Sequence, residues 1–378
     1  MRVVIADISG KVTNYDVALV EALNNQEGAG RYVFMAPRLR ALHLNFPHRS
    51  LLTLVPVKYA NSEGKLKRYV KAIEGCINYV YLVAYCIVRR IDVLHLQWLP
   101  FLEFNSIEIP LLRCFRKLFR RCKMVLTVHN IYPHDMSAVG KVKYKERMKS
   151  ASGLFDGFIV HTKNSRTALY DEFGIEQDKV DVIHHGIFAP KDLQITPNVS
   201  GGKWRFILYG NQFPYKGTDI FLDAVQLLPP AYKDKIKITI AGKIGDDYLQ
   251  ILKEKSYGLC VDWMSFFVPD EVLYQKILES NVIVLPYRQI SQSGVLLLAL
   301  HFRRYLLVSN LPSFRETLDG FSDDMFFENG NPASLAERIR AYMDGEVNLE
   351  EQKDAIEELN RKYSWNKAAE LTKQLYNR

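Results

Sequence analysis

The stretch WRFILYGNQFPYKGTDIFLDAVQLL, residues 204–228, joins two kinds of hydrophobic pattern across a single turn. Residues 204–210 form a short apolar run that is typical of a buried strand. The turn that follows contains Pro214 and Lys216, and residues 218–228 have the apolar spacing of a helix. A strand, a turn and a helix in this order form the repeating unit of a parallel sheet covered by helices.

The same unit recurs along most of the chain, where short β-branched runs alternate with longer helix-like segments. Near-continuous apolar strands separated by helices are typical of parallel sheets covered on both faces. A segment at 188–204 with two prolines, a Gly-Gly pair and no periodicity is expected to be a linker. We therefore predict an α/β protein with two doubly wound, Rossmann-like domains facing a cleft. The expected strands are 2–8, 92–98, 123–130, 157–162, 180–185, 204–210, 235–242, 281–287 and 305–310.

Length and composition agree with a folded protein of two domains. The chain has 378 residues, more than one ordinary core requires, and 48% hydrophobic with 24% charged residues is a globular composition. The N-terminus lacks the pattern of a signal peptide. The most apolar stretch of the first half, 76–88, is interrupted by Asn78 and is shorter than the roughly 20 residues that span a membrane. Five cysteines without a CxxC pair indicate buried thiols in a reducing compartment. We expect a cytoplasmic protein, soluble or peripheral.

Polar residues gather where the predicted strands end. Gly10 follows the first strand, His129 and His161 close two later ones, and polar stretches at 210–216 and 286–294 follow two strands of the second half. Because open α/β sheets bind ligands at the carboxyl ends of their strands, we expect the functional site there.

Two of these strand ends indicate a phosphate ligand. Residues 291–295, SQSGV, open an apolar helix whose first free N–H groups would suit an anion, and Gly294 would let that anion approach the backbone. The alternative is that Ser291 or Ser293 only caps a buried helix. Lys216 would project toward the same edge and neutralise a diphosphate leaving group, unless it is an ordinary solvated lysine.

His129 ends an apolar strand, where it could bond a substrate hydroxyl, carry a proton, or be a satisfied histidine at the edge of the core. Several motifs are absent from the sequence: GxGxxG after the first strand, GxxxxGK[ST], GxSxG, HExxH, and a DxD pair at a strand end. These absences favour a phosphorylated ligand handled without a metal.

The order of VLTVHN, FIVHTKNSRTAL, FILYGNQFPYKGTDIFLDAVQLL, SQSGVLLLAL and YSWNKAAELTKQLY resembles the family 4 glycosyltransferases, retaining enzymes of the GT-B fold. The resemblance covers nearly the whole chain. It implies an acceptor-binding domain at 1–190, a nucleotide-sugar-binding domain at 200–360, and a helix at 361–378 that returns to the first domain. It also implies transfer of a sugar from a UDP- or GDP-linked donor to a glycan or lipid-linked saccharide, with retention of configuration and with neither a metal nor another cofactor.

The resemblance also implies roles for individual residues. Lys216 matches the lysine on the donor diphosphate, and Gly10 matches a glycine turn near the same phosphates. His129 matches a strand-end histidine near the reacting sugar. Backbone amides would meet the diphosphate at Ser293, Gly294 and Val295.

The chain departs from the family pattern at three positions. A pair of glutamates eight positions apart is replaced by Ser291 and Ala299, and an arginine that commonly precedes the lysine by five is replaced by Asn211. We favour replacement of the missing donor contacts by Ser291, Gln292 and Asn211. The alternative is a non-catalytic subunit of the same fold that binds a sugar or a partner.

Positive charge is concentrated in the first half, where residues 1–200 hold 28 Lys and Arg against 18 Asp and Glu. In 111–123 the cations flank an apolar stripe at helical spacing, which is typical of an interfacial membrane helix, although the stripe could equally pack on its own sheet. A lipid-linked acceptor on the anionic inner face of the cell membrane would explain these charges. No RRM, KH or helix-turn-helix signature accompanies them, so we expect no nucleic-acid partner. The candidate membrane-facing cations are Arg113, Arg116, Lys117, Arg120 and Arg121.

Overall fold

The computed structural model describes residues 1–26, 31–37, 39, 44–53, 65–133, 136–188, 202–290 and 293–378. The chain divides into two compact units. The first is Met1–Gly186 together with Ser364–Arg378, and the second is Ile187–Tyr363. These divisions lie close to the borders at 190, 200 and 361 that the sequence analysis expects.

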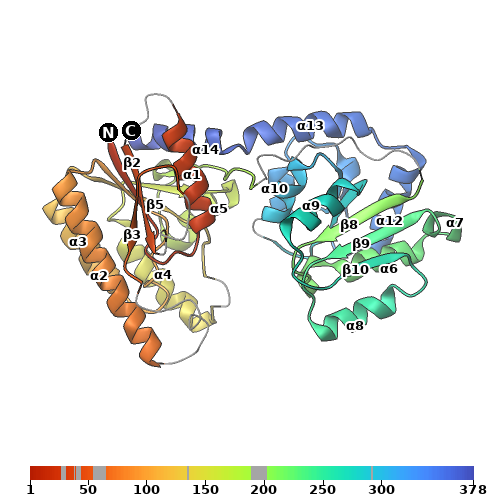
Figure 1. Cartoon of the computed structure of the whole chain (residues 1–378), viewed down its shortest axis with the longest axis horizontal. Helices are drawn as coiled ribbons and strands as arrows, with labels where there is room; N and C mark the ends of the chain where they lie inside the picture. Colours follow the sequence, from red (N-terminus) through yellow and green to blue (C-terminus); the bar gives the residue numbers. More distant parts are fainter. Residues whose placement is uncertain are drawn as a thin grey trace. The chain divides into compact units, whose positions relative to one another are not determined.

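The first unit is built on a parallel sheet of seven strands in the order β3-β2-β1-β4-β5-β6-β7 (Figure 1). The strands are β1 (Arg2–Ala6), β2 (Arg31–Pro37), β3 (His48–Leu51), β4 (Val93–Leu96), β5 (Lys123–Thr127), β6 (Gly157–Val160) and β7 (Val180–Val182). The helices are α1 (Thr13–Asn25), α2 (Lys65–Arg89), α3 (Glu108–Leu118), α4 (Ala138–Ser152), α5 (Lys163–Phe173) and α14 (Trp365–Asn377).

Alternate residues of the central strands in this sheet enter two different cores. Val4 and Ala6 of β1 pack with α2, α3, α4 and α5 on one face, whereas Val3 and Ile5 pack with α1 and α14 on the other. This division follows from the period of two along a strand, and it explains why the strands are apolar on both faces.

Helix α14 returns from the end of the second unit to the first, as the sequence analysis expects. It lies beside α1, and its Tyr376 hydroxyl hydrogen bonds Nδ1 of the buried His95 at 2.6 Å. At the start of the helix, a Cβ on Gly186 would lie 2.4 Å from the Trp365 ring, so the indole packs directly on the backbone there. Residues far apart in the sequence therefore form one face of the first sheet.

The second unit is built on a parallel sheet of six strands in the order β10-β9-β8-β11-β12-β13. The strands are β8 (Trp204–Tyr209), β9 (Ile236–Ala241), β10 (Val261–Met264), β11 (Val282–Leu285), β12 (Tyr305–Ser309) and β13 (Phe326–Phe327). The helices are α6 (Thr218–Leu227), α7 (Pro230–Lys233), α8 (Asp246–Lys255), α9 (Asp270–Leu278), α10 (Gly294–His301), α11 (Pro312–Thr317), α12 (Pro332–Asp344) and α13 (Leu349–Lys362). One core holds α6, α8 and α12, and the other holds α9, α10, α11 and α13.

Each sheet has one point at which the order of strands reverses. It lies between β1 and β4 in the first unit and between β8 and β11 in the second. Loops at the carboxyl ends of strands on either side of such a point diverge and leave room for a ligand. In the second unit these loops contain Lys216 and the start of α10, which are the two features that the sequence analysis singles out.

All nine expected strands are present, and the sheets contain four more: β2, β3, β10 and β13. The last three are the outermost strands of their sheets. They are short, and β3 and β10 are partly exposed, so they lack the long apolar run by which a central strand is detected. None of the five cysteines is in a disulfide. The expectation of buried thiols holds for Cys86 and Cys122 and is wrong for Cys114 and Cys260, which are exposed.

Candidate functional site

The turn after β8 places a lysine inside the second unit. A short 3₁₀ helix, Pro214–Lys216, leads into Gly217, which has a φ of 69° and begins α6. A Cβ on Gly217 would lie 1.8 Å from the carbonyl oxygen of Pro286, so only glycine fits this turn against the strand end of β11. The tight turn directs Lys216 inward, and its side chain is only 8% exposed.

The ammonium group of Lys216 has no acceptor within hydrogen-bond distance among the described residues, and no ion pair there includes it. The ammonium group lies over the ring of Tyr287, with Nζ 5.4 Å from the ring centroid. Burial lowers the pKa of Lys216 from 10.5 to about 8. The group therefore remains largely protonated at neutral pH while lacking the counterion that a buried cation normally has.

The start of α10 lies beside this lysine. A Cβ on Gly210 would lie 3.1 Å from Lys216 Nζ and 3.5 Å from Val295 Cγ2, so both side chains border the same point. The hydroxyl of Tyr209, the last residue of β8, donates to the carbonyl of Val295 at 2.6 Å and fixes the helix against the strand. An unpaired cation and a helix N-terminus thus meet at the carboxyl edge of one sheet, which is a favourable arrangement for an anion.

Ser293 is the N-cap of α10, and its Oγ accepts a hydrogen bond from Leu296 N at 3.1 Å. The capping role that the sequence leaves open is therefore real, and it coexists with the neighbouring lysine. A Cβ on Gly294 would meet no atom of the described residues within 4 Å. The space over this backbone is open, as close approach of a ligand would require. Ser291 and Gln292 lie outside the described residues.

Two side chains that the sequence analysis misses hold the lysine turn in place. Buried Gln212 donates from Nε2 to Gly210 O at 2.7 Å, and its Oε1 accepts from Thr218 Oγ1 at 2.5 Å. Arg288 forms a two-pronged ion pair with Asp219 and also donates to Pro214 O at 2.5 Å. Both residues lie in the polar stretches 210–216 and 286–294, but the sequence does not single them out, because each acts through contacts that only the folded turn creates.

The positions of the missing glutamates and arginine are informative. Ala299 is fully buried in the core formed by α10 and its neighbours. It therefore presents no polar atom that could replace a carboxylate. Asn211 is exposed at the start of the lysine turn, where its amide is available to a ligand.

The strand-end histidine of the first unit belongs to a connected group of polar rings. His161 Nδ1 donates to Ile183 O at 2.9 Å, so its Nε2 carries a lone pair and accepts from His129 Nδ1 at 3.1 Å. The other nitrogen of His129, Nε2, lies 3.3 Å from Gln97 Oε1. Because Nδ1 carries the proton of the neutral ring, Nε2 keeps a lone pair that faces an acceptor oxygen and is left for a hydrogen-bond donor.

Burial, and then the charges of His185 and His95, lower the pKa of His129 to about 3. The pKa of His161 is also well below its ordinary value, chiefly because of burial. Both rings are neutral at physiological pH. Among the roles that the sequence leaves open for His129, a neutral hydrogen-bonding residue fits this environment better than a proton carrier.

Aromatic rings enclose this histidine pair. The Tyr15 ring lies edge-on to His129 at 4.8 Å, and its other side meets Trp365 of the returning α14 at 5.3 Å. The Trp98 ring lies 6.3 Å from His129. None of the three aromatic residues is marked in the sequence, since they come from α1, the loop after β4, and the end of the chain.

Gly10 lies in the turn between β1 and α1 with a φ of 66°, as a glycine turn requires. Its N–H is not free, because it donates to Asp7 Oδ1 at 2.9 Å, and the same carboxylate accepts from Val12 N at 3.0 Å. A ligand at this turn would therefore meet a backbone without a side chain, and it would not receive a hydrogen bond from the Gly10 amide.

The basic segment differs from its expected form. α3 ends at Leu118, so Arg120 and Arg121 lie beyond the helix. Its apolar residues Leu112 and Phe115 are buried against the sheet, so the packing alternative holds for this helix. Arg116 is paired with Asp156, and the other four candidate cations are exposed. Over the described residues, no group of three or more His, Cys, Asp or Glu side chains is placed to hold a metal ion.

Solved structures with the same arrangement of two parallel-sheet units are glycosyltransferases of the GT-B fold, and the expected fold class is confirmed. A glycosyltransferase from Rickettsia africae matches with a TM-score of 0.69 and 15% identity, covering 100% of this chain and 98% of its own. HepE of Anabaena, in complex with UDP and glucose, matches with a TM-score of 0.65 and 13% identity, covering 100% and 99%.

The sequence comparisons extend this likeness. The family described as Glycosyltransferase Family 4 matches residues 53–188, and the family described as Glycosyl transferases group 1 matches 204–344. These two matches confirm the resemblance to the family 4 glycosyltransferases that is seen in the motifs of the chain. The chain is 25% identical over 235 residues to the GDP-mannose:glycolipid 4-beta-D-mannosyltransferase of Xanthomonas campestris pv. campestris. That match spans 58% of this chain and 62% of the length of the relative.

Proposed function

We propose that this protein transfers a sugar from a nucleotide-diphosphate donor to a glycan or lipid-linked saccharide, with retention of configuration and without a metal ion. The second unit binds the donor and the first unit binds the acceptor. The observation that carries the proposal is the unpaired Lys216 ammonium beside the N-terminus of α10. The names of the relatives support the proposed donor and acceptor classes, since one uses GDP-mannose with a glycolipid and another was solved with UDP and glucose.

The chemistry follows from where charge develops. Departure of a nucleoside diphosphate leaves a full negative charge on its terminal oxygens, and a cation with a helix N-terminus stabilises that charge as it forms. The Lys216 ammonium is already desolvated, so it needs little reorganisation when the diphosphate arrives. The acceptor hydroxyl would attack from the face that the diphosphate leaves: its oxygen bonds the anomeric carbon as the bond from that carbon to the diphosphate oxygen breaks, and its proton passes to the departing diphosphate. His129, being neutral, would bond a sugar hydroxyl.

A second function is favoured by one specific observation. Ala299 stands where the family has a donor-binding glutamate, and its burial leaves no polar substitute at that position. A non-catalytic subunit that binds a nucleotide sugar or a partner would retain Lys216 while dispensing with the carboxylates. In either case we propose a cytoplasmic protein.

Calorimetric titration with UDP, GDP and their common sugar conjugates tests the donor site. We expect one nucleotide to bind, with affinity at least about tenfold weaker in Lys216→Ala, as a lost charged hydrogen bond predicts. Lys235→Ala is the control, because Lys235 is exposed before β9 at the opposite edge of the same sheet. Absence of binding to every nucleotide would overturn the proposed donor site.

Turnover separates the two functions. With the donor identified, we expect release of the nucleoside diphosphate by hydrolysis or by transfer to an added saccharide acceptor, with the anomeric configuration of the product read by NMR. Tight binding without turnover would establish the non-catalytic alternative, and an inverted product would refute retention.

A further inference from the structure

The outer face of α2 is an apolar stripe that no part of the described chain covers. Its exposed hydrophobic side chains recur every three or four residues, so they lie on one side of the helix. A soluble protein seldom leaves such a row uncovered, and a continuous one marks an interaction surface. The exposed members are Ile73 (56%), Ile77 (46%), Val80 (60%), Tyr81 (43%), Ile87 (39%) and Val88 (78%).

This helix lies on the surface and does not cross a membrane within this fold. Val70–Arg89 has the length and apolar composition of a membrane span, and one third of that window is buried. The expectation from the sequence that the apolar stretch at 76–88 is too short to span a membrane therefore does not apply to the whole helix. The opposite face holds Tyr79 and Leu82, both fully buried in the core of the first unit. The Asn78 amide also makes two hydrogen bonds with the backbone of Leu52. Insertion across a bilayer would break these contacts, whereas binding along its surface would keep them.

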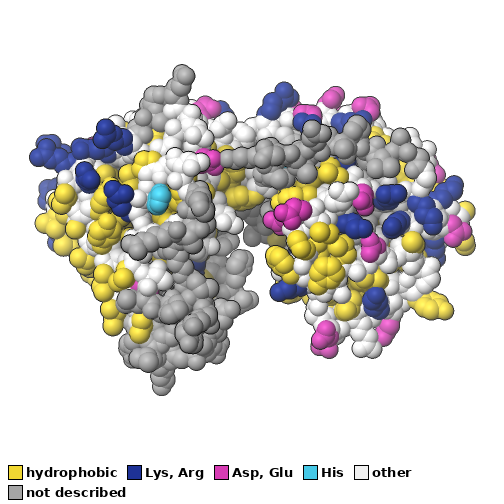
Figure 2. All heavy atoms as spheres, viewed as in Figure 1, with side chains coloured by type: hydrophobic (Ala, Val, Ile, Leu, Met, Phe, Trp, Pro, Cys, Tyr) yellow, Lys and Arg dark blue, Asp and Glu magenta, His cyan; other side chains and the backbone are white. Residues whose placement is uncertain are grey.

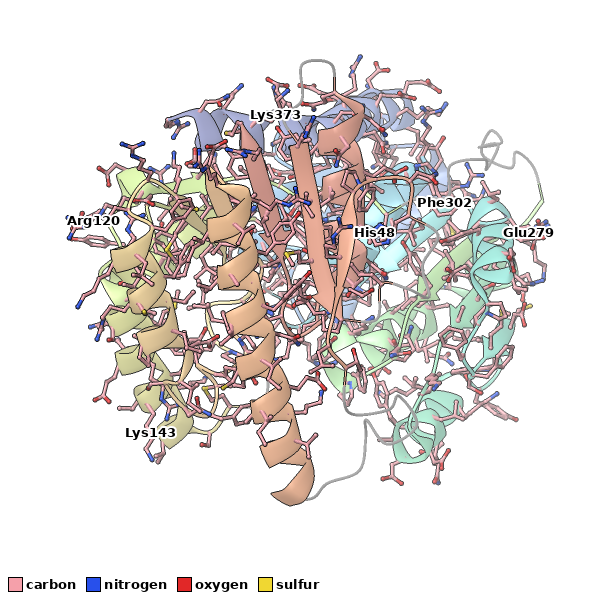
Figure 3. All side chains as sticks on the ribbon, turned by 60° about the vertical axis from the view of Figure 1, so that its left-hand side comes forward. His48, Arg120, Lys143, Glu279, Phe302 and Lys373 are labelled. Carbon is pink, nitrogen blue, oxygen red and sulfur yellow. The ribbon has the colours of Figure 1, made fainter. Side chains whose placement is uncertain are left out.

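Cations flank the stripe at one end. Arg89 and Arg90 are exposed at the end of α2, and Arg120 and Arg121 are exposed just beyond the neighbouring α3. Figure 2 shows hydrophobic side chains along the flank formed by α2 and α3, with a cluster of Lys and Arg at its upper end. Figure 3 shows Arg120 pointing away from the fold at that end. Between residues 65 and 91 the sequence has a single acidic residue, Glu74.

We propose that this surface, the outer face of α2 with the arginines at the ends of α2 and α3, docks the first unit on an anionic phospholipid membrane. The apolar side chains would enter the boundary between headgroups and acyl chains, and the arginines would contact lipid phosphates. The sequence pattern predicts an apolar membrane face on 111–123. In the structure the exposed apolar face lies on α2 instead. The inference concerns where the protein works and goes beyond the transfer reaction.

Charge argues for a membrane over a second copy of the chain. In a two-fold symmetric pair with the two α2 helices parallel, the arginines at the ends of these helices would meet, and the sequence of α2 has a single acidic residue, Glu74. Like charges brought together in this way oppose association, whereas an anionic lipid surface complements them.

Co-sedimentation with phosphatidylcholine vesicles, with and without phosphatidylglycerol, tests the proposal. We expect wild type to bind the anionic vesicles preferentially. Val80→Glu with Val88→Glu should reduce the partition coefficient at least about tenfold, because two exposed valines that would enter the apolar layer are replaced by carboxylates. Arg120→Gln with Arg121→Gln should weaken binding to anionic vesicles by about tenfold or more and leave binding to neutral vesicles unchanged.

The matched control is Val139→Glu with Val142→Glu on α4, where the two valines are 67% and 60% exposed. This pair makes the same chemical change away from the stripe, so we expect vesicle binding at the wild-type level. All variants change exposed side chains, and thermal unfolding would verify that they fold.

Four results would overturn the proposal. The first is equal binding of wild type to neutral and anionic vesicles. The second is an equal loss of binding in both valine pairs. The third is a dimer in the absence of vesicles that Val80→Glu with Val88→Glu dissociates, which would assign the stripe to a second copy. The fourth is resistance of bound protein to alkaline extraction, which would mean that α2 spans the bilayer. Nucleotide is absent from these assays, so they succeed or fail separately from the donor site.

Discussion

A basic side chain lies desolvated at the carboxyl edge of each sheet, and the two differ in charge. Lys216 of the second unit has a pKa lowered to about 8, so it stays largely charged at pH 7 although nothing in the described chain pairs with it. His129 of the first unit has a pKa lowered to about 3 and donates a hydrogen bond from Nδ1 to His161. Burial acts on both groups in the same direction. The outcome differs because a lysine begins about four pH units above a histidine.

The comparison separates two kinds of polar site. An unpaired, desolvated cation lowers the free energy of unfolding. This loss of stability is offset only when an anion binds, so the cation acts as a binding element. A neutral ring that donates from one nitrogen and keeps a lone pair on the other costs little at pH 7, and it can accept a hydrogen bond from a substrate hydroxyl without exchanging a proton. The following predictions test this distinction between the two sites.

The largest expected effect is loss of stability in acid. The pKa values of His95 and His129 are lowered to about 3 and that of His161 is also far below normal, so the unfolded chain binds protons near pH 6.5 and the folded chain does not. The free energy of unfolding should fall by up to about 4 kcal/mol per pH unit below 6.5. Urea unfolding between pH 5 and 7.5 measures this slope, and His129→Gln with His161→Gln should flatten it. Histidine ring resonances that titrate near pH 6.5 would contradict the assignment.

Lys216→Met should change stability and donor affinity in opposite directions. Removing a desolvated, unpaired charge should raise the free energy of unfolding by about 2 kcal/mol at pH 7, while donor affinity falls about thirtyfold. Thermal unfolding and calorimetry on the same samples measure both, with Lys235→Met as the control. A variant that loses stability would mean that the ammonium has a partner in the folded protein.

Alkaline pH should weaken donor binding through the same group. Only the protonated Lys216 attracts a diphosphate, so affinity should be level below about pH 8 and fall up to tenfold for each unit above it. Stability should move the other way, rising above pH 8 because the unfolded chain still holds the proton there. Titrations at pH 7, 8 and 9 test the affinity, and Lys216→Met should lose this dependence. An affinity that is level to pH 9 would exclude Lys216 from the diphosphate contact.

The smallest effect is expected for Gly294→Ala. A Cβ there meets no protein atom, and alanine in the first turn of α10 should leave stability unchanged or raise it by about 0.5 kcal/mol. If the diphosphate approaches this backbone, donor affinity should fall several-fold. Gly153→Ala, equally open at the end of α4, should leave affinity unchanged. Unaltered donor binding in Gly294→Ala would place the phosphates elsewhere.

Much of the fold could be predicted from periodicity, because central strands such as β1, β8 and β11 are apolar on both faces. Lys216 and Gly294 could be found for a related reason, since they follow such strands directly. Gln212 and Arg288 could not, because they act through a backbone carbonyl and a side chain that the turn brings to them. Exposure of the apolar face of α2 also could not be predicted from the sequence, because the same spacing of Ile, Val and Tyr suits a buried helix as well as an exposed one.

The sequence alone determined the alternation of strands and helices, two sheets, and the polar residues at their carboxyl edges, because these depend on patterns within a few neighbouring residues. Tertiary structure decided which of those polar residues would keep a partner. Lys216 is an unpaired cation and His129 a neutral ring because residues distant in the chain exclude water from both. Within the described chain, these distant residues supply a hydrogen-bond acceptor to His129 and none to Lys216.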